Sequence, residues 1–127
     1  MSGGPLKTKS YQFAVEIVLL TKLLQSEKKE FVLSKQILRS GTAIGALIME
    51  GEYAQSPLDF INKLSISLKE ANETLYWLNL LRDCDYISTE IFNDKSIKNK
   101  ELISMLVSSI NTMKSKLSEK LKTKNEK

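Results

Sequence analysis

The sequence predicts an all-α protein, an antiparallel up-down four-helix bundle, from three observations. Four segments carry apolar residues at three- and four-residue steps, the spacing of one helix face. The chain holds only 5 Gly and 2 Pro, too few for the many turns of an all-β fold. Its 127 residues suit one domain with a core of its own. We expect residues 1–9 to be a flexible leader, 10–122 the bundle and 123–127 a disordered basic tail.

The first helix is expected from about Ser10 to Ser26. Its inner face comprises Phe13, Ile17, Leu20 and Leu24, and Val15, Val18 and Leu19 widen that face. The charged residues 26–30 that follow are typical of a connection.

The second helix is expected from about Leu33 to Tyr53, with Ser34 as its candidate N-cap. Its inner side comprises Ile37, Ile44 and Ile48. Residues 43–49 are apolar all round, which indicates burial on more than one side, by neighbouring helices or by another subunit. Gly41 and Gly45, four residues apart, favour close helix contact.

The third helix is expected from Pro57, capped by Ser56, to about Asp83. Its predicted seam consists of Ile61, Leu64, Leu68, Ala71, Leu75 and Leu78. Further apolar residues lie off this seam. The third helix therefore carries more apolar surface than a single monomer can bury in its own core. Together with the second helix, this surplus predicts a homo-oligomer.

Residues 83–100 are mostly polar, and Ser88 or Thr89 is expected to cap a short helical turn there. The fourth helix is expected from about Asn99 to Lys122. Its predicted inner stripe consists of Leu102, Leu106, Ile110, Met113, Leu117 and Leu121.

The composition argues against catalysis. The chain has no His, the commonest general base and metal ligand. Its one cysteine, Cys84, lies between Asp83 and Asp85, whose charges oppose thiolate formation, so we expect an inert thiol in a reducing compartment. The N-terminus lacks the regions of a signal peptide and no apolar run is long enough to cross a membrane. We therefore expect a cytoplasmic protein that is no enzyme, holds no metal or cofactor and contacts no membrane.

The charge is unevenly distributed. Residues 1–94 carry 10 Lys and Arg against 12 Asp and Glu, or −2, whereas residues 95–127 carry 9 Lys against 3 Glu, or +6. Such asymmetry favours an acidic partner. The candidate nucleic-acid-binding residues are Lys7, Lys9, Lys35, Lys114, Lys116, Lys120, Lys122 and Lys124. An equally weighted alternative is that cations near a helix C-terminus simply favour the helix dipole.

Arg39 and Glu50 are eleven residues apart and share a face of the second helix. We expect a structural polar group of Arg39, Glu50 and Glu70 that sets the register between the second and third helices. The alternative is a polar site in a pocket between helices, to which Glu73, three residues after Glu70, would belong.

Two stretches resemble a known family: residues 33–40 continuing to 46–51, and residues 59–64 followed by 68–71 and 73–78. The family comprises bacterial four-helix-bundle proteins encoded in intervening sequences of large-subunit ribosomal RNA genes, and the accessory variability determinant of diversity-generating retroelements is a relative. The matching positions are Gln36, Arg39, Glu50, Gly51, Phe60, Leu64 and Glu70. Ala43 and Leu47 depart from the family, which often has Ser and Asn there; these changes favour an apolar contact over a polar pocket.

The resemblance implies a four-helix protomer, a ring-shaped homopentamer and a positively charged surface that binds nucleic acid. In the retroelement branch it implies a reverse transcriptase as partner. The first hypothesis is thus a non-catalytic oligomer that binds RNA or DNA electrostatically with weak sequence specificity, as an accessory to ribosomal RNA or to a reverse transcriptase. The second is a protein-interaction scaffold, for instance for a ribosomal component, without direct nucleic-acid binding. An enzyme is the third, least favoured hypothesis.

Overall fold

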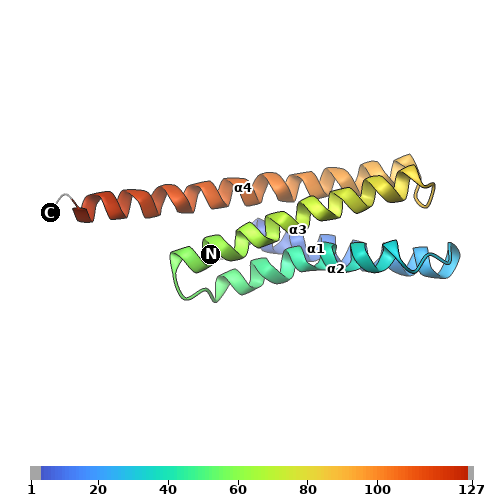
Figure 1. Cartoon of the computed structure of the whole chain (residues 1–127), viewed down its shortest axis with the longest axis horizontal. Coiled ribbons are helices and arrows are strands. Elements are labelled where there is room, and N and C mark those ends of the chain that lie inside the picture. Colours follow the sequence, from blue (N-terminus) through green and yellow to red (C-terminus); the bar gives the residue numbers. More distant parts are fainter. Residues whose placement is uncertain (1–3, 126–127) are drawn as a thin grey trace.

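The computed structural model describes residues 4–125, which form four helices and no strand. The helices are α1 (Gly4–Glu27), α2 (Leu33–Glu52), α3 (Pro57–Asp83) and α4 (Thr89–Asn125). Figure 1 shows successive helices running back and forth along the long axis, with α4 extending past the connection between α2 and α3. None of the helices in this part of the chain is long and apolar enough to span a bilayer.

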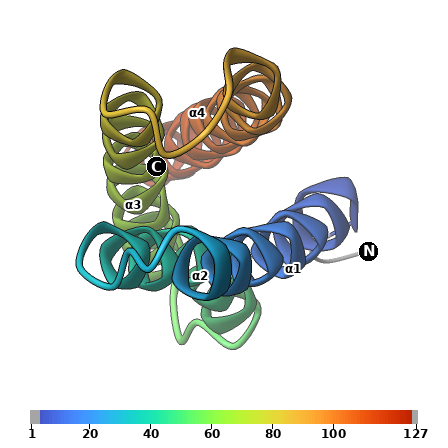
Figure 2. The same cartoon turned by 90° about the vertical axis from the view of Figure 1, so that its right-hand side faces the viewer.

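Each helix contacts two others. The pairs α1–α2, α2–α3 and α3–α4 pack along their lengths, whereas α4 meets α1 over a shorter stretch. The pairs α1–α3 and α2–α4 are not adjacent, so the helices surround one shared interior, as the end-on view in Figure 2 shows.

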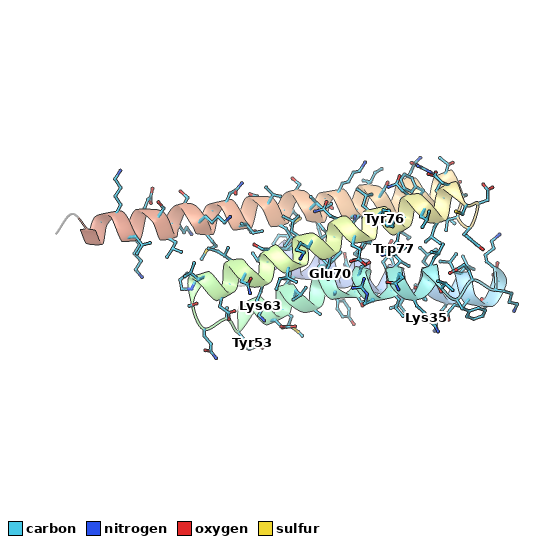
Figure 3. The ribbon with its side chains drawn as sticks, viewed as in Figure 1. Lys35, Tyr53, Lys63, Glu70, Tyr76 and Trp77 are labelled. Atoms are coloured by element: carbon cyan, nitrogen blue, oxygen red, sulfur yellow. The ribbon has the colours of Figure 1, made fainter. Side chains whose placement is uncertain are left out.

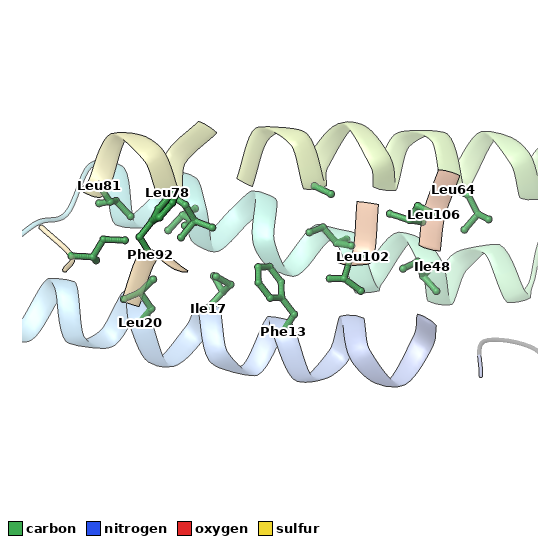
Figure 4. Close-up of a cluster of buried hydrophobic side chains, with 14 of the residues drawn as sticks. Phe13, Ile17, Leu20, Ile48, Leu64, Leu78, Leu81, Phe92, Leu102 and Leu106 are labelled. Atoms are coloured by element: carbon green, nitrogen blue, oxygen red, sulfur yellow. The ribbon is translucent and has the colours of Figure 1, made fainter. Parts of the chain in front are cut away.

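The core is a single cluster to which all four helices contribute (Figure 4). The predicted inner residues of the first two helices are buried: Phe13, Ile17, Leu20, Leu24, Ile37, Ile44 and Ile48. Of the other two predicted stripes, the buried members are Ile61, Leu64, Ala71, Leu78, Leu102, Leu106 and Ile110. The all-α class and most of its core are therefore confirmed.

Some predicted core positions are wrong. Val15, Val18 and Leu19 do not widen the inner face of α1, because their side chains are exposed on its outer side. Leu68 is only partly buried, and the α3 seam instead runs through the fully buried Ser67, whose Oγ donates to the carbonyl of Ile44 at 2.9 Å.

Thr74 takes the other seam position, in place of the half-buried Leu75, and its Oγ1 donates to Ser40 Oγ at 2.9 Å. On α4, Met113 and Leu117 pack partly against the core, but Leu121 is exposed.

Three predicted boundaries also change. α1 begins at Gly4, so residues 4–9 are helical and not a flexible leader, and residues 1–3 lie outside the described part. α4 begins at Thr89, ten residues earlier than Asn99, and forms one continuous helix through residues expected to hold only a turn. It runs to Asn125, so residues 123–125 are helical and not a disordered tail, and residues 126–127 lie outside the described part.

The N-cap predicted for α3 is confirmed, and Ser88, one of two residues expected to cap a short turn, instead caps α4. Ser56 Oγ accepts the N–H of Asp59 at 3.0 Å, and Pro57 follows in the first turn. Ser88 Oγ accepts the N–H of Ile91 at 3.1 Å. At α2 the prediction is wrong: Ser34 does not cap the helix, and the carboxylate of Glu30 takes that role.

The close contact predicted at Gly41 is confirmed. A Cβ atom there would lie 2.9 Å from Ile17 Cγ2, so the missing side chain lets α2 approach α1. At Gly45 a Cβ atom would lie 3.3 Å from the carbonyl oxygen of Ser10, again on α1. Gly41 and Gly45 thus allow α2 to pack closely against α1 at two successive turns of α2.

Candidate nucleic-acid interface

The lysines near the end of α4 are exposed. Lys114, Lys116, Lys120 and Lys122 have no ion-pair partner among the described residues. Lys124 belongs to the same helix, and its side chain lies outside the described part. This stretch contains the part of α4 that extends past the other helices in Figure 1, so its cations face solvent on several sides.

Helical geometry places these lysines on both sides of a narrow apolar stripe formed by Met113, Leu117 and Leu121. At 100° per residue, Lys116 and Lys120 flank one side of the stripe and Lys114 flanks the other. The cations therefore surround the helix end and form no single flat patch. Such an arrangement can contact phosphates from several directions.

The other predicted lysines do not join this group. Lys7 pairs with Glu52 at 2.9 Å, and the hydrogen bond and charge of Glu52 raise the pKa of Lys7 above its ordinary value. Lys9 pairs with Glu101 at 2.7 Å. Lys35 is exposed, but it lies on α2 towards the end of the molecule opposite the α4 terminus (Figure 3). Lys7, Lys9 and Lys35 therefore lie on other helices than the five candidates at the end of α4.

The predicted polar group between α2 and α3 is present in altered form. Arg39 Nη1 lies 3.2 Å from Glu70 Oε1, and Arg39 Nη2 contacts Glu73 Oε2. Glu73 also accepts the indole N–H of Trp77 at 3.0 Å. Figure 3 shows Glu70 and Trp77 on α3, on the side that faces α2. Glu73, not Glu50, thus completes the group.

Glu50 has a different partner from the one expected: its Oε1 lies 3.3 Å from Lys63 Nζ on α3. Both ion-paired sets join α2 to α3 and so fit the register-setting role. The carboxylates that could have served acid–base chemistry, Glu50, Glu70 and Glu73, are each paired with a cation.

A third charged cluster, which the sequence analysis missed, joins α1 to α4. Glu16 Oε1 lies 2.6 Å from Lys95 Nζ and 3.0 Å from Lys98 Nζ, and Asp94 pairs with both lysines. The partners of Glu16 are 79 and 82 residues away along the chain, so no local pattern could reveal them.

Electrostatics within this cluster favour the charged forms. Burial alone would raise the pKa of Glu16, but hydrogen bonds and charges from Lys95 and Lys98 outweigh it, and the net pKa is lowered. The hydrogen bond from Lys95 lowers the pKa of Asp94. The hydrogen bond to Glu16 raises the pKa of Lys98. These ion pairs join α1 to α4 and stabilise the charged forms of Glu16, Asp94 and Lys98.

No group of three or more Cys, Asp or Glu side chains within residues 4–125 is placed to hold a metal ion. Cys84 is exposed at the end of α3.

Four packed helices with buried apolar seams, and no strand between residues 4 and 125, define the class as a four-helix all-α protein. The chain belongs to the family of 23S rRNA-intervening sequence proteins, whose model matches residues 6–108. The family resemblance found in the sequence is therefore confirmed.

A solved structure of a protein of unknown function, from the S23 ribosomal protein family of Bacteroides thetaiotaomicron, is similar to the chain. The two share 55% sequence identity and a TM-score of 0.85 over 87% of this chain and 99% of that one. None of the curated proteins compared with the chain matches it. The family match stops at residue 108, so the lysine-rich end of α4 lies outside it.

Proposed function

We propose that the protein is a non-catalytic, homo-oligomeric nucleic-acid-binding protein whose phosphate contacts come mainly from the end of α4. The observation that carries the proposal is the exposure of Lys114, Lys116, Lys120 and Lys122, with no ion-pair partner in the described chain. Residues 95–127 carry 9 Lys against 3 Glu, and an assembly multiplies this charge by the number of subunits.

Binding of this kind is electrostatic and weakly selective. No aromatic residue follows Phe92, so the lysine-rich stretch offers no ring on which a base could stack. The family description names the intervening sequence of 23S ribosomal RNA, which makes structured RNA the first ligand to test. The ion pairing of Glu50, Glu70 and Glu73 supports a role without catalysis.

We further propose that an antiparallel bundle is the protomer and that protomers assemble as a ring, with the pentamer implied by the resemblance favoured. The protein is expected to act in the cytoplasm, as an accessory to ribosomal RNA or to a reverse transcriptase. The alternative is a protein-interaction scaffold that does not bind nucleic acid directly.

The test is titration of a labelled RNA stem-loop, followed by fluorescence anisotropy at about 50 and 200 mM salt. If four lysines contact phosphates, affinity should fall by about 10²-fold between these salt concentrations. Replacing Lys114, Lys116, Lys120 and Lys122 by Gln should abolish most of this salt dependence.

The matched control replaces four exposed lysines elsewhere by Gln and removes the same charge: Lys28, Lys29, Lys69 and Lys100. It should retain most of the affinity. An equal loss in both variants would show that the end of α4 is not the contact surface. Absence of binding at low salt would reject the proposal, and capture of a protein partner that resists nuclease would then favour the scaffold.

A further inference from the structure

The outer face of α1 is apolar, which is unusual for a helix that already buries its inner face. Tyr11 is 71% exposed, Leu19 58%, Val15 43% and Val18 38%. Leu23 continues this surface towards the end of the helix. The surplus apolar surface predicted for the second and third helices is larger on α1, which has five exposed large apolar side chains against Met49, Leu58 and Tyr76 on α2 and α3.

The exposed side chains follow a helix-packing seam. Tyr11, Val15, Val18 and Lys22 are four, three and four residues apart, so they lie in one line along α1. Lys22 ends the line, and the aliphatic part of its side chain can cover apolar surface while the ammonium group stays in water. This spacing suits a contact with another helix.

A hollow adjoins this ridge. A groove of about 700 Å³ lies between α1 and α2, and its lining includes Tyr11, Ala14, Gly45, Ala46 and Met49. Small residues form much of its lining, so it has room for side chains from outside. The one charged residue in its lining, Lys7, is paired with Glu52.

We infer that this face of α1 and the adjoining α1–α2 groove is where a second copy of the chain docks. This inference depends on the homo-oligomer of the proposed function and identifies the interface between its copies. The face carries both a ridge of Val and Leu side chains and a hollow lined by small residues. The ridge of one copy can therefore pack into the groove of the next, a head-to-tail contact of the kind that closes into a ring.

The size and charge of the face support this occupant. Tyr11, Leu19 and Met49 are each more than half exposed, so the face offers large apolar side chains to an interface of the standard size, ~800 Å² on each side. Lys22 is the one unpaired charge on the ridge, which leaves little for the phosphates of a nucleic acid to contact. Most soluble oligomers are assembled from identical chains.

The test is the mass of the full chain in solution, measured by light scattering during size-exclusion chromatography. The wild type is expected to have a multiple of the single-chain mass, unchanged by nuclease or by about 0.5 M salt, because apolar contacts are not screened. The double substitution Val15→Glu with Val18→Glu should lower the mass to that of one chain. The control is Ile97→Glu with Val107→Glu, which places the same charges on exposed apolar positions of α4 and should leave the mass unchanged.

Circular dichroism checks that both variants keep the helix content and cooperative unfolding of the wild type. If the α1 variant stays folded at the wild-type mass, the oligomer stands and the α1 interface is overturned. A wild type with the mass of one chain overturns both the oligomer and its interface. Loss of the assembly on nuclease treatment also overturns the inference, since the copies would then be held together by nucleic acid.

Discussion

The carboxylate of Glu30 accepts the backbone N–H of Ser34 at 2.7 Å, and thereby caps α2 from the connection that precedes it. The same side chain accepts the N–H groups of Val32 and Leu33 at 3.1 and 3.0 Å. These are amides that the first turn of a helix leaves without a helical partner. Burial alone would raise the pKa of Glu30, but these hydrogen bonds outweigh it and lower the pKa below its ordinary value of 4.5.

Glu30→Gln should therefore lower the free energy of unfolding by about 1–2 kcal/mol at pH 7, because an uncharged amide is a weaker acceptor of three N–H groups. The folded-state pKa lies below the unfolded one, so the charged Glu30 stabilises fully above about pH 4.5. That contribution is lost as the pH falls through the folded-state pKa. Urea unfolding of both proteins at a series of pH values should show the difference narrowing in acid.

Glu27→Gln is the matched control for this prediction. Glu27 ends α1, is exposed, and forms no described hydrogen bond or ion pair, so its substitution should change the unfolding free energy by less than about 0.5 kcal/mol. A Glu30→Gln variant whose deficit stayed constant down to pH 3 would show that the carboxylate charge is not what caps the helix.

Gly41 offers a second prediction. A methyl group at this position would meet the fully buried and branched Ile17 at 2.9 Å, and close packing leaves Ile17 little room to move. Gly41→Ala should lower the unfolding free energy by about 1–3 kcal/mol, despite the better helix propensity of Ala. Thermal and urea unfolding at one fixed protein concentration would measure it.

Gly51 is the control within the same helix. A Cβ atom there would lie 3.4 Å from Phe60 Cδ1, an ordinary van der Waals contact. Gly51→Ala should therefore be neutral or add up to about 1 kcal/mol through helix propensity. Equal effects at the two glycines would mean that the approach of α1 to α2 does not depend on Gly41.

The sequence predicted elements whose signals are local. Ser56 and Pro57 mark the start of α3 because a cap and a fixed φ act on the next turn alone. The start of α4 was missed because two of its inward positions are polar. Ser96 and Asn99 are buried, and Asn99 Nδ2 donates to the carbonyl of Ala71 at 3.0 Å, so the apolar period is interrupted there.

The candidate site was only partly predictable for a related reason. The sequence shows where the lysines are but not which carboxylates they pair with. Lys7 and Lys9 are paired with Glu52 and Glu101, which lie 45 and 92 residues further along the chain. Conversely, an exposed Val or Leu on α1 has the same three- and four-residue spacing as a buried one. Which face of α1 turns inward depends on contacts with α2 that the periodicity of α1 does not contain.

The ion pairs of Glu16 with Lys95 and Lys98 support a third prediction. They join α1 to α4, the two adjacent helices that share the shortest contact. Glu16→Gln should lower the unfolding free energy by about 1 kcal/mol, since it leaves the half-buried Lys95 without its α1 partner. Added salt should reduce the difference between variant and wild type, because screening weakens the ion pairs. Thermal unfolding at about 0.05 and 1 M salt would check both parts.

Acid should also weaken the ion pairs of Glu16 with Lys95 and Lys98. The pKa of Glu16 is lowered on folding from its ordinary value of 4.5, so its stabilising contribution is complete above that pH and is lost below it. Glu119→Gln serves as control, because Glu119 is an exposed residue of α4 without a described partner. A deficit for Glu16→Gln that neither salt nor acid reduced would point to packing in place of charge.

The end of α4 supports the last prediction, in which the chain is shortened in two steps. Every described side chain from Ser118 to Thr123 is exposed, so a chain that ends after Leu117 should lose less than about 1 kcal/mol of unfolding free energy. A chain that ends after Thr112 also loses Met113 and Leu117, which pack partly against the core, and should be about 2 kcal/mol less stable than the first. Urea unfolding at equal protein concentration gives both values. A large loss in the longer chain would mean that residues 118–127 are themselves held by a neighbouring copy, because within one chain their described side chains face water.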